Sequence, residues 1–283
     1  MSPPRQSPLG WCFLCGRVYT KAGMARHVRK HLKERQGDTP LVWLRVTDDT
    51  PWAPLPSQLF WLDLEVPLDL PLVNLDDFLR AVWVECCGHL SHFVATYQDA
   101  TIYFEVHPSE PVPTKEDFEE DIRLYGEPVP DSSAPLWVQF AQAFPGPGGV
   151  EMPANLFTMG DLAQVVDEFA YKYDFGTTTT LNLRVLARYT GPHPEGTPPI
   201  RVLSRNLKPR IPCEVCGQPS AYLAADDKGY IRPLCQQHAD EAYDKGEVEY
   251  LYPLANSPRT GLCGYNGPSQ EKWKFEALAP EWA

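Results

Sequence analysis

The sequence contains no long hydrophobic run. No stretch approaches the roughly 18 consecutive apolar residues that a membrane-spanning helix requires, so we expect no membrane partner. The first ten residues, MSPPRQSPLG, also lack the basic and then apolar order of a secretory signal. These two absences lead us to expect a cytoplasmic protein, of prokaryotic origin.

Familiar catalytic motifs are absent as well. The chain has no GxSxG sequence, no phosphate-binding loop and no HExxH sequence. One candidate for a metal-dependent hydrolase remains, because His89 and His92 lie beside Cys86 and Cys87, and Asp174 could converge on them. A histidine just after the end of a helix often only forms a hydrogen bond with the backbone. An aspartate before Phe-Gly is commonly a turn residue. We therefore expect a non-catalytic protein and leave this site open.

The composition is that of a folded protein with stiff connections. Of 283 residues, 43% are hydrophobic, which suffices for one large or two modest domains. The 30 prolines are about twice the average share of a globular protein. Because proline restricts the backbone and breaks helices, we expect short elements and long connections rather than a helical bundle.

Positive charge is concentrated at the start of the chain. The net charge is −12, but residues 1–37 carry +7, which leaves −19 for the remainder. Residues 105–131 alone contain nine acids against two bases. A cationic head on an anionic body indicates that the head meets a polyanion and that the body faces protein. A solvated helix face explains the same charges equally well.

The head also contains a metal-ligand pattern. Its spacing is Cys-x2-Cys-x11-His-x3-His, in which the two histidines share one helical face. Thiolates and imidazoles suit a tetrahedral zinc ion. The pattern resembles the two-Cys, two-His zinc finger and predicts one zinc ion held by Cys12, Cys15, His27 and His31.

The finger helix predicts contacts with nucleic acid that carry little sequence information. In the docking mode of such fingers, base contacts would come from Thr20, Gly23 and Arg26, and only the arginine can grip a guanine edge. We expect the helix to contact phosphates instead, through Arg26, Arg29, Lys30 and Lys33. A second basic strip, residues 201–210, could add to this nucleic-acid contact.

A second ligand pattern lies near the C-terminus. Two pairs, each two residues apart, are separated by 18 residues, as in zinc-ribbon or treble-clef modules. The spacing predicts a second tetrahedral zinc ion held by Cys213, Cys216, Cys235 and His238. Cys263 follows in a glycine-rich segment that should wrap the body, and we expect it to be buried or free rather than a ligand.

The central part predicts an α+β domain. Strands are expected at 41–46, 59–66, 92–97, 101–106, 169–173 and 178–189. Helices are expected from an Asn74 cap to Gly88, over 115–125 after Thr114, and after Thr158. The order of strand, helix and hairpins favours a mostly antiparallel sheet with packed helices.

The leucine-rich helix before GHLSHF and the sequence FAYKYDFG at 169–176 resemble the plasmid pRi ORF-three-like family over roughly residues 40–190. The specific motif is Tyr173–Gly176, and the finger sequence YTKAGMARH resembles extended relatives. Where family members continue with an acid, a tryptophan and a histidine, this chain has Thr177–Thr180. The resemblance implies a passenger protein of plasmids and mobile elements, from a family without a settled biochemical function.

These patterns divide the chain into four parts. We expect a zinc finger at 1–37, an α+β domain at 38–190, a proline-rich and basic linker at 191–212, and a zinc module with a tail at 213–283. The function we expect is that of a zinc-binding, non-catalytic protein that contacts the phosphate backbone of nucleic acid, as a DNA-binding protein does, and whose body contacts protein. We expect two structural zinc ions per chain. A protein–protein adaptor with structural zinc ions and a metal-dependent hydrolase are the alternatives.

Overall fold

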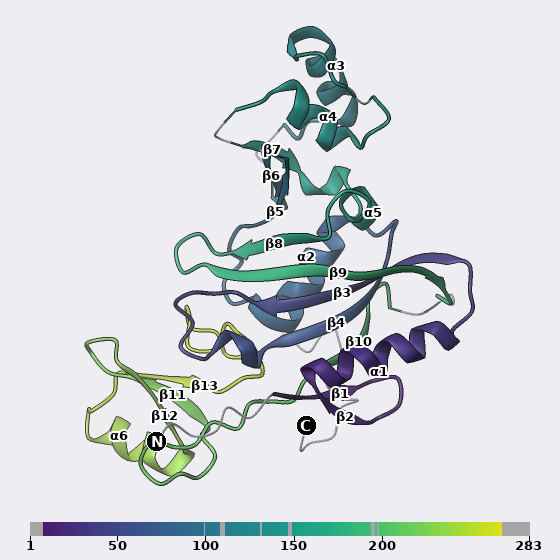
Figure 1. Ribbon diagram of the computed structural model, residues 1–283. Helices are drawn as coiled ribbons and strands as arrows, with labels where there is room; N and C mark the ends of the chain where they lie inside the picture. The colour runs from purple at the N-terminus through teal and green to yellow at the C-terminus, as the bar shows by residue number, and fades with distance from the viewer. Residues whose placement is uncertain are drawn as a thin grey trace.

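A ten-stranded sheet forms the centre of the protein (Figure 1). The computed structural model describes residues 8–98, 100–107, 111–130, 132–146, 149–193, 196 and 198–267. All strand pairs in this sheet are antiparallel except β6 with β7, which confirms the expected α+β class. The strands, in spatial order, are β2 (Val18–Thr20), β1 (Leu9–Cys12), β10 (Arg201–Asn206), β4 (Trp61–Pro67), β3 (Thr39–Asp48), β9 (Thr179–Gly191), β8 (Glu168–Tyr173), β5 (Ser91–Tyr97), β6 (Ala100–Glu105) and β7 (Val150–Pro153).

The two faces of the sheet are covered by different helices. Because side chains alternate along a strand, Val42 and Leu44 of β3 point into the main core while Trp43 points to the opposite face. The main core also contains α2 (Leu72–Leu79), which Figure 1 shows behind β9 and β3. The Trp43 face carries α1 (Lys21–Glu34), drawn in purple in front of the sheet.

Helix α2 differs from the sequence-based expectation at both ends. It begins at Leu72 after Pro71 rather than at the predicted Asn74 cap, because proline fits the position before a helix without losing a hydrogen bond. It then continues as a π-helical turn, η2 (Arg80–Val84), and ends at Glu85. The chain therefore leaves the helix just before Cys86, and not at Gly88.

Three further helices lie between β6 and β8 in the chain. The helices expected after Thr114 and Thr158 are confirmed as α3 (Lys115–Tyr125) and α5 (Met159–Ala163), and each begins with a capping box, formed by Thr114 with Asp117 and by Thr158 with Asp161. The sequence did not indicate α4 (Leu136–Ala143), which packs beside α3. Short 3-10 turns occur at η1 (Ser57–Leu59) and η3 (Ala154–Leu156).

The segment expected as a linker, 191–212, contains a strand of the main sheet. Strand β10 pairs with β1 on one side and with β4 on the other. The N-terminal hairpin is thereby hydrogen-bonded to the body, because β10 occupies the position between them. Residues 194, 195 and 197 of this segment lie outside the described part of the chain.

The C-terminal part forms a small three-stranded sheet followed by a segment that returns to the body. The sheet has the order β12 (Ile231–Leu234), β11 (Tyr222–Ala225) and β13 (Tyr250–Pro253), and α6 (Gln236–Asp244) packs against it. The following segment, 254–267, contacts the body as expected, since Ser257 donates a hydrogen bond to the carbonyl of Trp83 at 2.6 Å. In the described part of the chain, no helix is long and apolar enough to span a bilayer.

Candidate metal centres and cationic surface

The four predicted finger ligands lie together at one end of α1. Cys12 ends β1, the turn after it brings Cys15 back, and His27 and His31 lie one turn apart on α1. All four ligand atoms are within 4.8 Å of one another. The Nε2 atom of His27 is 3.0 Å from Cys15 Sγ and 3.1 Å from His31 Nε2. A tetrahedron with zinc–ligand bonds of 2.0–2.3 Å has edges of about 3.3–3.8 Å, so this set can close on one ion.

Two local features build this arrangement. Gly16 adopts a φ of +69° in the turn after Cys12, and its amide donates to the Cys12 carbonyl at 2.8 Å. Thr20 caps α1 by accepting a hydrogen bond from the Gly23 amide. Burial and the neighbouring charges of His31 and Arg17 lower the pKa of His27, which favours the neutral imidazole that binds metals.

The finger shares its core with the sheet instead of having a separate one. Met24, Val28 and Leu32 on the inner face of α1 are buried against Trp43, Trp61 and Leu203. At the end of the helix, Arg35 forms an ion pair with Glu65, a fully buried carboxylate of β4. Helix α1 is thus fixed on the sheet by packing and by charge.

The opposite face of α1 is cationic and exposed. Its members are the four basic residues singled out from the sequence, Arg26, Arg29, Lys30 and Lys33. The Arg29 guanidinium lies over the Trp43 ring, 5.9 Å from its centre, although Arg29 is an exposed residue. We call these four residues the α1 cationic face.

The second predicted ligand set is also assembled, in the C-terminal module. Cys213 and Cys216 lie on a turn before β11, and Cys235 and His238 lie at the start of α6. The Cys216 and Cys235 sulfurs are 3.8 Å apart, and Nδ1 of His238 is 3.6 Å from Cys213 Sγ and 3.2 Å from Cys235 Sγ. These distances again match the edges of a zinc tetrahedron.

Backbone amides prepare this second set for metal binding. Gly217 has a φ of +73°, and its amide donates to the Cys213 carbonyl at 2.8 Å, which closes the turn. Burial alone would raise the pKa of Cys213, but backbone hydrogen bonds from Cys235, Cys216 and Val215 lower it to about 6. The thiolate, which is the form that binds a metal, is therefore favoured.

A third group was missed by the sequence analysis. Cys86, Cys87, His89 and Cys263 place their ligand atoms within 4.8 Å of one another. Cys263, expected to be buried or free, is half-buried and lies 3.2 Å from His89 Nε2. Spacing could not reveal this group, because more than 170 residues separate Cys263 from its neighbours. Three Cys/His groups in the described chain could therefore hold metal ions, where the sequence indicated two.

Two of the three residues of the hydrolase alternative lie together, since His89 Nε2 is 3.6 Å from Asp174 Oδ2. His92 is not a member of the Cys/His group that contains His89. The His92 ring packs instead against Tyr103 and Phe175, and its Nε2 atom is buried without a hydrogen-bond partner among the described residues. Asp174 accepts backbone hydrogen bonds in a turn, the role that the sequence analysis gave as its ordinary alternative.

The carboxylate of Asp174 forms an ion pair within the protein, with Arg259. Burial raises the pKa of this carboxyl, but hydrogen bonds from Arg259, Thr177 and Gly176 outweigh burial and lower the pKa below its ordinary value. An ionised carboxylate paired with a buried arginine stabilises the fold around the turn.

The basic strip at 201–210 is only partly available. Arg201 forms an ion pair with Glu65, and Arg205 is buried and donates to the carbonyl of Asn256. Arg201 is half-buried beside Glu65, whereas Arg205 is buried. Only Lys208 and Arg210, which follow β10, are exposed.

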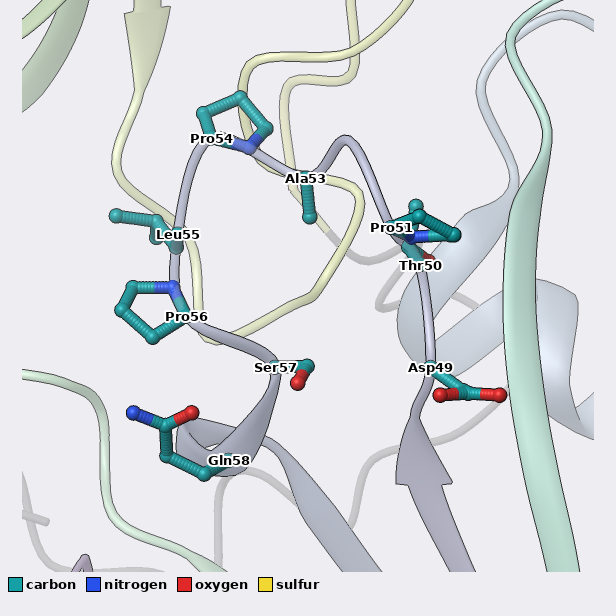
Figure 2. Close-up of a pocket in the computed structure, with 9 residues that line it drawn as sticks. All are labelled: Asp49, Thr50, Pro51, Ala53, Pro54, Leu55, Pro56, Ser57 and Gln58. Carbon is teal, nitrogen blue, oxygen red and sulfur yellow. The ribbon is translucent and has the colours of Figure 1, made fainter.

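A pocket of about 510 Å³ opens under the proline-rich connection between β3 and η1 (Figure 2). Figure 2 shows Asp49 at the end of β3, on the other side of the arch from Leu55 and Pro56. Asp49 is the only ionisable residue in its lining, so the pocket lacks a pair of acid and base groups.

Comparisons with known proteins leave this chain without a family. No protein-family model matches the sequence, and no curated protein matches it. Among solved structures, the chain is similar to a protein of unknown function, MM3350, from Methanosarcina mazei Go1. The identity is 16%, the match covers 64% of this chain and 76% of that chain, and the TM-score is 0.37. A likeness of this size supports no argument about fold or function, so the resemblance to the pRi ORF-three-like family stays a prediction.

Proposed function

We propose that this protein is a non-catalytic, zinc-binding protein that contacts the phosphate backbone of nucleic acid through the α1 cationic face. The observation that carries the proposal is the exposure of Arg26, Arg29, Lys30 and Lys33 on a helix whose inner face is packed on the sheet. A rigid row of cations can be presented to a polyanion without ordering a mobile segment first. Such contacts give affinity that depends strongly on salt.

Zinc is the metal that fits the ligands. The finger set offers two thiolates and two imidazoles, and the C-terminal set three thiolates and one imidazole. Hard cations such as Mg²⁺ and Ca²⁺ prefer oxygen ligands, whereas these donors suit Zn²⁺. With four protein ligands in each set, no position remains for a substrate water, so both ions would be structural. The eight cysteines are all free, as expected for a reducing compartment such as the cytoplasm.

The same helix is poorly suited to read a base sequence. The Thr20 hydroxyl oxygen already accepts the Gly23 amide at the start of α1, and Gly23 has no side chain to offer. Of the three positions used for base contacts, only Arg26 presents a donor to the groove. We therefore infer binding without strong sequence preference.

A protein partner for the body is the second part of the proposal. Helix α3 is rich in acids, and its last turn exposes Leu124 and Tyr125, which are 55% and 75% accessible. A protein partner could bury these two apolar side chains within a polar rim. The pure adaptor, in which α1 is only a solvated face, is the competing function. Membership of the pRi ORF-three-like family, with its plasmids and mobile elements, remains a proposal that rests on Tyr173–Gly176.

Salt dependence separates phosphate binding from the adaptor. We would measure the affinity of the full chain for a mixed-sequence DNA duplex at several salt concentrations, alongside the variant in which Arg26, Arg29, Lys30 and Lys33 are all alanine. Each lost phosphate contact should flatten the slope of log affinity against log salt by nearly one unit. We expect the quadruple variant to lose binding while its fold is kept.

The matched control removes the same charge elsewhere. Arg123, Arg184, Lys228 and Lys245 are exposed and lie outside α1, so their fourfold alanine variant should bind as tightly as the parent. Equal binding by the α1 variant and the parent would contradict the proposal and favour the adaptor. A preference of more than about 2 kcal/mol for one duplex sequence would contradict the non-specific mode.

A further inference from the structure

The structure joins two distant segments at a group of thiols that no spacing motif indicates. Cys86, Cys87 and His89 follow the π-helical turn η2, and Cys263 comes from the segment 254–267 that returns to the body. We propose that these four side chains bind a third zinc ion, which fixes the C-terminal segment to the body. This inference is independent of the α1 cationic face, since the group lies on a different part of the sheet.

The geometry of this group resembles that of the two predicted sites. The four ligand atoms lie within 4.8 Å of one another, as in the other two groups. The Nε2 atom of His89 is 3.2 Å from Cys263 Sγ, which equals the 3.2 Å between His238 Nδ1 and Cys235 Sγ in the C-terminal module. Three thiolates and one imidazole repeat the donor set of that module and again select Zn²⁺.

The turn that carries three of the ligands is held in place from the sheet. The hydroxyl oxygen of Tyr173, at the end of β8, accepts hydrogen bonds from the amides of Cys86 and His89, each at 3.3 Å. The same hydroxyl donates to Glu85 at 2.9 Å, and Glu85 in turn accepts the Gly88 amide at 2.6 Å. This network orients the ligands before a metal binds, as supporting hydrogen bonds do in known metal sites.

A buried cation lies beside the sulfurs. One guanidinium nitrogen of Arg259 is 3.4 Å from Cys86 Sγ and also donates to Asp174. Arg259 is fully buried and comes from the same segment as Cys263. Three thiolates and one Zn²⁺ leave one negative charge, and a hydrogen bond from a guanidinium stabilises that charge. Tyr173 and Asp174 of the Tyr173–Gly176 motif therefore both act on this group.

The backbone around Cys263 provides a separate observation. Cys263 has a φ of +46°, which is uncommon for a residue other than glycine, between Gly261 at +82° and Gly264 at +67°. The surrounding contacts must impose this conformation, and it turns the thiol towards His89. A strained loop of this kind is typical of a ligand site.

The third site would account for every remaining cysteine. The finger uses two of the eight cysteines, the C-terminal module uses three, and this group uses the last three. All eight are free, so no disulfide competes for these sulfurs. The π-helical turn directly before Cys86 fits this role, because such turns often occur at functional sites.

Metal counting on the full, reduced chain tests the proposal. Zinc would be measured by native mass spectrometry at a free concentration set by a competing chelator. We expect three ions in the wild type, two in Cys263→Ser and three in Cys263→His, because histidine restores a ligand and tolerates a positive φ. Cys15→Ser serves as a control that removes an ion from the finger instead.

Substitution of zinc by Co²⁺ provides a second readout, the thiolate-to-cobalt absorption. This absorption reports the number of coordinated sulfurs even when a variant is only partly folded. Thiolate-to-cobalt absorption scales with the number of coordinated sulfurs, so Cys263→Ser should lose three-eighths of the wild-type signal, and Cys263→His only one-eighth. A wild-type chain with two ions and eight reduced thiols would overturn the proposal. Three ions retained by Cys263→Ser would overturn it too.

Discussion

Arg259 and Asp174 form a buried ion pair, although 85 positions separate them in the chain. The Arg259 side chain is completely inaccessible and that of Asp174 is 6% accessible. Arg259 also donates to the Thr177 carbonyl at 2.6 Å and lies over the Tyr173 ring at 5.0 Å. One side chain from the C-terminal segment thus holds the whole turn that follows β8.

Breaking this pair from one side should destabilise the protein strongly. In Asp174→Asn, the amide oxygen keeps the turn, and asparagine tolerates the φ of +65°, but the Arg259 charge loses its partner. We expect a loss of about 3–5 kcal/mol in the free energy of unfolding, because an uncompensated charge stays buried. Urea unfolding of the zinc-loaded protein would measure it.

The double variant Asp174→Asn with Arg259→Met is the control for that experiment. With both charges removed, the combined loss should be smaller than the sum of the two single losses, since no charge is left unpaired. Additive losses would show that the two side chains stabilise the fold separately.

Removal of the metal ions should destabilise the fold of the C-terminal module more than the fold of the finger. The core of that module contains few residues, Cys213, Ala224, Leu234, Ala239, Ala242 and Val248, so its folding energy depends on its ion. Helix α1 packs on Trp43 and Trp61, and we expect these contacts to hold it in place when the ion leaves. In a chelator, hydrogen exchange should rise first over 213–253 and later over 21–34, as mass spectrometry can follow. Simultaneous exchange of both segments would contradict this order.

His92 should make the protein sensitive to mild acid. Burial, with a smaller effect of Lys172, lowers the pKa of His92 from 6.5 to about 4. Between these values the unfolded chain binds a proton that the folded chain does not, so stability falls as the pH drops. We expect the His92 contribution to fall by about 2 kcal/mol between pH 7 and pH 5.

The variant His92→Phe isolates this effect. Phenylalanine keeps the aromatic packing against Tyr103 and Phe175 but cannot take up a proton. Urea unfolding at pH 7 and pH 5 should show a smaller loss in the variant than in the wild type. Equal losses would mean that protonation of His92 does not contribute.

The sequence predicted features that depend on short-range geometry. The helices after Thr114 and Thr158 begin with capping boxes that span four residues each, and the two ligand sets repeat known local spacings. These helix starts and ligand sets could therefore be predicted. The contact of Cys263 with His89 depends on how the sheet and the C-terminal segment are arranged, which no local pattern contains. Strand β10 was hidden in the same way. The basic residues of this strand suggested a segment exposed to solvent, but Arg201 forms an ion pair with Glu65 from a neighbouring strand.

The core that the finger shares with the sheet leads to a last prediction. Val28 is fully buried on the inner face of α1, in one cluster with Trp43 and Trp61. Shortening it to alanine removes two methyl groups and leaves a cavity, at a cost of about 2–3 kcal/mol. If the finger were an independent module, only the finger would be weakened. Because β1 pairs with β10 and α1 covers β3 and β4, we expect Val28→Ala to lower the unfolding midpoint of the whole sheet.

Tryptophan fluorescence can follow this transition, since Trp43 and Trp61 lie directly under α1 on strands β3 and β4. Lys33→Ala is the matched control, because Lys33 lies on the exposed side of the same helix and surface changes are usually within about 0.5 kcal/mol. A Val28→Ala chain that unfolds at the wild-type midpoint but binds zinc more weakly would contradict the fused core. A lowered midpoint at full zinc loading supports it, because the loss then arises from packing between α1 and the sheet and not from the ion.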